Sequence, residues 1–159
     1  MGKFADRHLV LNLSTDSVDA WTGTVNTACV NMKGWDECTF TLAKTTGPTG
    51  TLEARIHSST DTTPTSTHGV SRQFYRSCKA SDSNSEMTAW VECTSSGFMI
   101  TAGAHEIWQV YTKAEYMYDG DNYVWLNTTE VVDHPLGGAT ICTLTGPSYG
   151  RKISDDVLA

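Results

Sequence analysis

The sequence is poor in charge, in long apolar runs and in recognisable leader segments. Charged residues make up 18% of its 159 residues, against about a quarter in an average soluble protein. No stretch approaches the roughly 20 apolar residues that a membrane-spanning helix needs. Residues 1–8 carry charges where a signal peptide would have its apolar core, so we expect synthesis in a cytoplasm.

Basic residues are also scarce. The 11 Lys and Arg residues are outnumbered by 18 Asp and Glu residues, so the formal net charge is −7 at pH 7. A nucleic-acid-binding protein needs a basic surface that displaces counterions from phosphates. An anionic membrane surface likewise attracts clusters of Lys and Arg. We therefore expect no nucleic acid and no membrane among the partners of this chain.

The cysteines lack the spacing of a metal site. There are five of them, an odd number, and no two form a Cys-x-x-Cys pair. In a reducing compartment an unpaired cysteine behaves as a small apolar core residue. We favour this interpretation over a disulfide framework for the whole set, Cys29, Cys38, Cys78, Cys93 and Cys142.

Catalytic motifs are missing as well. The nucleophile elbow, the P-loop, the dinucleotide fingerprint and the zinc-protease motif are all absent, and the five histidines are scattered. The stretch 119–122 (Asp-Gly-Asp-Asn) could present oxygens to Ca²⁺, but it is more typical of a turn. Residues 130–135 place an acid near His134, although Pro135 indicates a strand end. We expect no enzyme activity, no catalytic residue, no metal and no cofactor.

What the chain does contain is threonine and alternating apolar positions. In 35–44 the apolar residues Cys38, Phe40 and Leu42 alternate with polar ones, and 51–58 repeats the pattern with Leu52, Ala54 and Ile56. This period of two predicts strands with one buried face, and we interpret the two segments as an antiparallel hairpin. Further strands are predicted at 24–31, 71–78, 88–93, 98–101, 105–112, 122–132 and 138–145.

The strands predict an all-β fold, an antiparallel β-sandwich or jelly roll of about eight to nine strands with extended termini. We assign the sandwich domain to residues 21–146. Residues 1–20 are predicted to form an N-terminal arm and residues 147–159 a C-terminal arm, and either arm could order on a neighbouring subunit.

Aromatic side chains suggest where such a domain would contact other molecules. Tyr123 and Trp125 share one face of the predicted strand 122–132, opposite Val124 and Leu126. Outward-facing aromatic residues serve either protein interfaces or glycan platforms, and we favour the protein interface. The predicted contact residues are Trp21, Tyr123 and Trp125, together with the tail residues Tyr149, Arg151 and Lys152.

Several segments resemble a group of small structural proteins of tailed phages. These are 30–35 (Val-Asn-Met-Lys-Gly-Trp), 60–65 (Thr-Asp-Thr-Thr-Pro-Thr), 74–76 (Phe-Tyr-Arg) and 124–133 (Val-Trp-Leu-Asn-Thr-Thr-Glu-Val-Val-Asp). The resemblance covers roughly residues 24 to 149, and its motifs are structural. The many cysteine and tryptophan residues of this chain depart from the group's pattern.

The resemblance implies a virion component of the capsid decoration, or cement, type. Such a protein is made in the cytoplasm of a bacterial host and binds the major capsid protein on the head shell. It is expected to act as a homo-oligomer, with a trimer favoured. Two alternatives stay open: a tail-associated structural protein, and a β-sandwich module that binds glycans.

Overall fold

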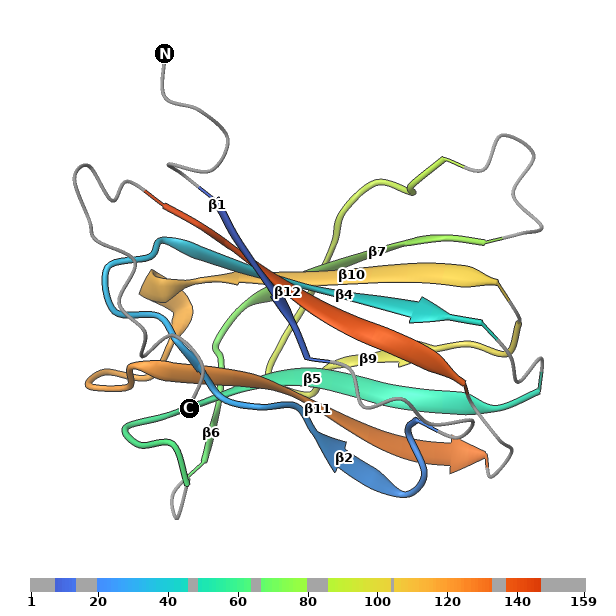
Figure 1. Cartoon of the computed structure of the whole chain (residues 1–159), viewed down its shortest axis with the longest axis horizontal. Coiled ribbons are helices and arrows are strands. Elements are labelled where there is room, and N and C mark those ends of the chain that lie inside the picture. Colours follow the sequence, from blue (N-terminus) through green and yellow to red (C-terminus); the bar gives the residue numbers. More distant parts are fainter. Residues whose placement is uncertain are drawn as a thin grey trace.

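The structure is a computed structural model that describes residues 8–13, 20–45, 49–63, 67–79, 86–103, 105–132 and 137–146. Within these ranges the chain forms two antiparallel sheets that pack against each other (Figure 1). This arrangement confirms the all-β sandwich that the alternating pattern predicted. No helix in the described ranges is long and apolar enough to cross a membrane.

Each sheet contains six strands. The first sheet has the order β1 (His8–Asn12), β12 (Gly138–Thr145), β4 (Glu37–Lys44), β10 (Glu106–Lys113), β7 (Gln73–Cys78) and β8 (Val91–Cys93). The second sheet has the order β2 (Thr24–Asn26), β11 (Tyr123–Val132), β5 (Thr51–Ser59) and β6 (His68–Gly69), with β3 (Val30–Asn31) paired to β11 and β9 (Phe98–Ile100) paired to β5. A 3₁₀ turn, Ala114–Tyr116, follows β10.

The core lies between the two sheets and is built from the alternating apolar positions. Every second residue of β4 and of β5 is buried. Phe40 and Leu42 of the first sheet and Leu52 and Ile56 of the second all belong to one apolar cluster. Because side chains alternate across a strand, burying these residues turns the intervening ones outward.

The predicted hairpin between the segments 35–44 and 51–58 is wrong. Strand β4 pairs with β12 on one side and β10 on the other, whereas β5 pairs with β11, β6 and β9. The two strands therefore belong to different sheets. Each has one apolar face, and the two faces pack against each other in the core between the sheets.

Part of the predicted N-terminal arm is a strand of the first sheet. Strand β1 pairs antiparallel with β12, with His8 opposite Thr145 and Asn12 opposite Ile141. The remaining residues of the arm up to residue 19, apart from Leu13, lie outside the described ranges, and so does all of the predicted C-terminal arm.

All five cysteines have free thiols in the structure. Cys38 and Cys142 lie on the neighbouring strands β4 and β12, with their Sγ atoms 3.4 Å apart. Burial, and secondarily the contact with Cys142, raises the pKa of the Cys38 thiol well above its usual value. Because the thiolate is the reactive form, this pair behaves as core packing.

Truncation of a central core residue should test this packing. Phe40→Ala is expected to lower the free energy of unfolding by about 3–5 kcal/mol, because a fully buried ring is replaced by a cavity. Thr39→Ala, on the outer face of the same strand, should cost less than about 1 kcal/mol. Urea unfolding monitored by tryptophan fluorescence measures both. Equal losses would contradict the assigned faces of β4.

Candidate binding surface on the first sheet

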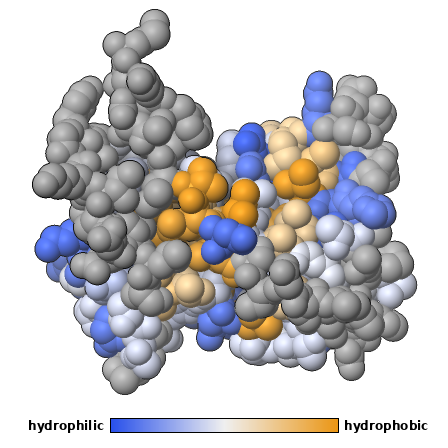
Figure 2. Space-filling view, viewed as in Figure 1, coloured by the Kyte–Doolittle hydropathy of each residue, from blue (hydrophilic) through white to orange (hydrophobic). Residues whose placement is uncertain are grey.

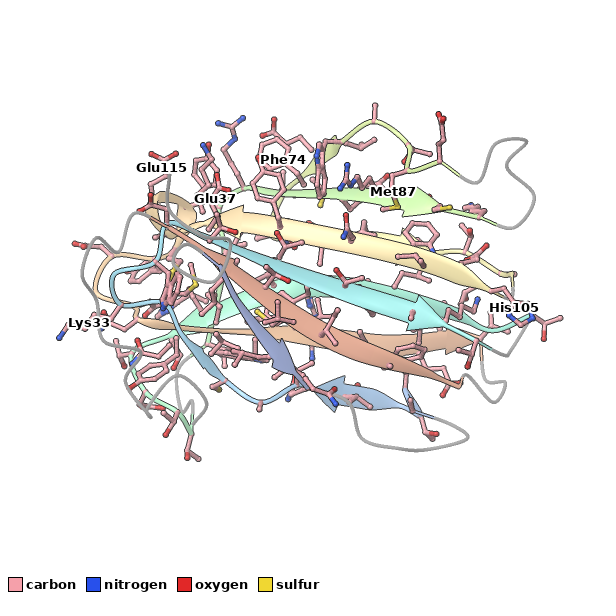
Figure 3. All side chains as sticks on the ribbon, turned by 45° about the horizontal axis from the view of Figure 1, so that its top comes forward. Lys33, Glu37, Phe74, Met87, His105 and Glu115 are labelled. Carbon is pink, nitrogen blue, oxygen red and sulfur yellow. The ribbon has the colours of Figure 1, made fainter. Side chains whose placement is uncertain are left out.

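The outer face of β7 and β10 carries a row of aromatic side chains. The two strands pair antiparallel, with Phe74 opposite Tyr111 and Arg76 opposite Gln109. Because directly opposite residues share one face of a sheet, the rings of Phe74 and Tyr111 meet. They stack with their centroids 5.0 Å apart. Figure 3 shows Phe74 on the outside of its strand, on the same side as Glu37 and Glu115.

Trp90 extends this row toward the edge of the sheet. It comes directly before β8 and is 39% exposed, and its ring meets Tyr111 edge-on at 4.9 Å. The guanidinium of Arg76 lies over the Trp90 ring, with its central carbon 4.3 Å from the ring centroid. Arg76 Nε donates a hydrogen bond of 2.8 Å to Gln109.

A second arginine closes the row at its other end. Arg72 donates from Nε and Nη2 to the two carboxylate oxygens of Glu92, at 2.7 and 2.9 Å. These hydrogen bonds hold the pKa of Glu92 below its usual value. The same guanidinium lies 5.1 Å from the ring centroid of Tyr116 and 5.5 Å from that of Phe74.

These side chains together form what we call the aromatic–arginine face: Arg72, Phe74, Arg76, Trp90, Tyr111 and Tyr116. Tryptophan, tyrosine and arginine are the residues most enriched among the energetic centres of protein interfaces. The face is built on paired strands and its side chains hold one another in place. Its composition and order suit the binding of another protein surface.

The opposite part of the first sheet is also apolar on its outer side. Val10 of β1 is 53% exposed and Ile141 of β12 is 38% exposed. Figure 2 shows hydrophobic residues gathered over the middle of the molecule, with more polar residues around them. This part is aliphatic and lacks the aromatic and arginine side chains that are enriched at the energetic centres of protein interfaces, so it is a weaker candidate than the aromatic–arginine face.

Two of the predicted contact residues are not exposed. Trp21 is 4% exposed and belongs to the core cluster, where it packs so closely against Gly138 that a side chain at Gly138 would collide with the indole. Trp125 is 3% exposed and stacks on His57 at a centroid distance of 5.6 Å. Trp21 therefore faces the core, against the prediction. Trp125 lies on the face opposite Val124 and Leu126, as predicted, but it is covered and not exposed.

The other predicted contact residues are placed differently. Tyr123 is half-buried at the start of β11, where it pairs with Asn31 and Ser59 in the second sheet. Tyr149, Arg151 and Lys152 lie outside the described residues. Of the predicted contact residues that the structure describes, Trp21, Tyr123 and Trp125, none belongs to the aromatic–arginine face.

Sequence reasoning missed this face, although a signal for it exists. Phe74 and Arg76 alternate within the predicted strand 71–78, and Gln109 and Tyr111 alternate within 105–112. Residues two apart in a strand share a face, so both pairs could have been placed together on the side away from the core. The pairing of these two strands, and the approach of Trp90, could not be deduced from that periodicity.

A serine, an aspartate and a histidine meet at one end of the second sheet. Ser58 Oγ donates to Asp121 Oδ2 at 2.6 Å, and His68 Nδ1 lies 3.1 Å from the same oxygen. The imidazole also stacks on Tyr118, with centroids 4.0 Å apart. In a hydrolytic triad the histidine stands between serine and carboxylate. Here the carboxylate stands between them, so this arrangement does not activate the Ser58 hydroxyl.

The cluster instead anchors the turn that leads into β11. Asp121 N–H donates to Tyr118 O, and Gly120 between them has a φ of +88°. A positive φ at the third position of a four-residue turn favours glycine. This geometry confirms the interpretation of 119–122 as a turn, although it links the 3₁₀ turn to a strand and does not form a two-strand hairpin.

The acid-and-histidine stretch 130–135 is described only in part. Glu130 Oε2 accepts a hydrogen bond of 2.9 Å from Gly23 N–H, which ties β11 to the segment before β2. His134 and Pro135 lie outside the described residues. Among the described residues no group of three or more His, Cys, Asp or Glu side chains could hold a metal ion.

Comparison with known proteins gives one kind of match. No protein-family model matches the chain, and no curated protein matches it. Among solved structures, the chain is similar to the SPBc2 prophage-derived protein YomS, with a TM-score of 0.41 and 8% sequence identity over 87% of this chain and 91% of that one. A similarity of this size bears on neither function nor partner.

Removing the Ser58 hydroxyl should separate an anchoring role from a chemical one. Ser58→Ala is expected to lower the free energy of unfolding by about 1–3 kcal/mol, because the buried Asp121 carboxylate loses its shortest hydrogen bond. Ser96→Ala, at an exposed serine, should change it by less than about 0.5 kcal/mol. Thermal and urea unfolding measure both, and an unchanged Ser58→Ala protein would contradict the anchoring role.

Proposed function

We propose that the chain is a non-enzymatic structural protein of a tailed-phage virion, and within that class a decoration protein that binds the assembled capsid. The observation that carries this proposal is the aromatic–arginine face, a partly exposed and ordered surface with the composition of a protein interface. The resemblance of segments such as 60–65 and 124–133 to tailed-phage structural proteins supplies the class.

The sandwich makes this face suitable for repeated docking. Strand β10 is paired along its whole length with β4, and β7 pairs with both β10 and β8. The backbone under the aromatic rings is therefore fixed before a partner arrives. A preordered surface loses less conformational entropy on binding, so a modest contact area can hold a partner.

In the proposed mechanism the face docks on the major capsid protein at the outside of the shell. Each copy adds a small buried area between neighbouring capsid subunits. Because a shell repeats the same site many times, modest contacts multiply in their effect on the particle. A homo-oligomer, with a trimer favoured, would engage several sites at once and hold more tightly than one copy.

The geometry of Trp90 favours a protein partner over a glycan. Sugar rings bind by stacking on an open aromatic face, whereas the Arg76 guanidinium covers one face of Trp90. The Phe74 and Tyr111 rings also stack on each other. Aromatic rings covered in this way are better suited to a protein surface than to a stacked sugar ring.

Virions offer the first test of the proposal. Mass spectrometry of purified particles should find the chain at a copy number set by the symmetry of the head. Deleting its gene should make heads release DNA at a lower temperature, because the contacts between capsid subunits are fewer. Particles without the chain would contradict the proposal, and a copy number that follows the tail would favour the tail-associated alternative.

Complementing the gene deletion with variant chains tests whether the heat resistance of the heads depends on the aromatic–arginine face. A Trp90→Ala chain should fail to restore the heat resistance of the heads, because the most exposed ring of the face is gone. A Val131→Ala chain, altered at an exposed apolar residue of the second sheet, should restore it. Restoration by both variants would place the docking surface elsewhere on the chain.

A further inference from the structure

Arg76 differs from the other arginines that the structure describes. Arg72 forms a two-bond pair with Glu92, and Arg55 lies 3.8 Å from Glu53. Arg76 has no carboxylate within ion-pair distance among the described residues. A half-buried guanidinium without a carboxylate partner among the described residues is an unusual feature of this face.

The side chain of Arg76 is nevertheless held in one place. Its guanidinium lies over the Trp90 ring, and its Nε is bonded to Gln109, which in turn donates to Thr41 Oγ1 at 3.2 Å. One face of the guanidinium is therefore covered by Trp90, and its Nε–H is used by Gln109. Its terminal nitrogens form no hydrogen bond with the described part of the chain. They make up the fork that binds a carboxylate through two parallel hydrogen bonds.

Several charged side chains on this side of the first sheet are paired with one another. Glu92 is paired with Arg72, and Lys113 lies 4.0 Å from Glu37 and 3.9 Å from Glu115. Arg76 is therefore a local positive charge on a chain whose net charge is −7. A partner that binds at Arg76 would carry a negatively charged group with apolar atoms beside it. Those apolar atoms would pack against the exposed part of Trp90.

We propose that Arg76 is the anchor of the face and binds an aspartate or glutamate side chain of the partner protein. This inference rests on the proposed function and adds the chemistry of its docking site. The carboxylate accepts two hydrogen bonds from the terminal nitrogens, and an apolar neighbour of that acid packs on Trp90. Shielding from water at the centre of the interface strengthens the pair.

Binding to particles that lack the chain tests the anchor. Heads purified from the gene-deletion phage are titrated with labelled protein. Arg76→Gln should weaken binding at least tenfold, because the partner carboxylate loses both hydrogen bonds. Arg76→Lys should not restore it, since a lysine lacks the planar fork. Arg55→Gln, on the second sheet, should bind like the unaltered protein.

The outcomes separate this inference from the function on which it rests. If the unaltered protein does not bind the heads, the proposed function fails. If it binds and Arg76→Gln binds equally well, only the carboxylate anchor is overturned. Unfolding curves of both Arg76 variants should match that of the unaltered protein, and a variant that is unfolded at the assay temperature would place Arg76 in the fold and overturn its role as an anchor.

Competition identifies the source of the carboxylate. Poly-L-aspartate should displace the unaltered protein from the heads at low salt, and raising the salt concentration should weaken binding of the unaltered protein more than that of Arg76→Gln. Sialyllactose, a sugar that carries a carboxylate, should not displace it. Displacement by sialyllactose at the same carboxylate concentration would contradict a protein partner.

Discussion

The face-to-face packing of two half-apolar sheets is the constraint from which the rest of this structure follows. Phe40 and Leu42 on one side and Leu52 and Ile56 on the other must all leave water together. Their burial fixes which face of β4 and of β5 points into the core. The residues that alternate with them on each strand therefore point outward. Phe74 of β7 and Tyr111 of β10 face outward because Tyr75 and Val110, their neighbours in sequence, face inward.

Much of this arrangement could be predicted from local sequence, but strand partners could not. The alternation in 51–58 and the strand-like run 138–145 predicted strand limits within one residue of β5 and β12. The same alternation is satisfied by a hairpin or by two strands in opposite sheets, because both bury the same residues. The choice between them depends on β10, β11 and β12, which lie far along the chain from β4 and β5.

The candidate site was harder to predict because tryptophan serves cores and interfaces equally well. Trp21 and Trp125 are covered, while Trp90 is the exposed one, and nothing in their immediate sequence distinguishes them. Arg76 meets Trp90 only because β7 pairs with β8 and the residues before it. The exposure of a side chain and the absence of a charge partner are properties of the folded chain. The proposed role of Arg76 could therefore be recognised only once the pairing of the strands was known.

The central claim is that the outer face of β7 and β10 is the surface that docks on other protein chains of a virion. A cryo-electron microscopy map of the intact particle tests it most directly. The map should contain the sandwich on the head shell, with Arg76 and Trp90 against the capsid protein and an acidic side chain at the guanidinium. A sandwich attached through its second sheet, with the aromatic–arginine face open to solvent, would contradict the claim.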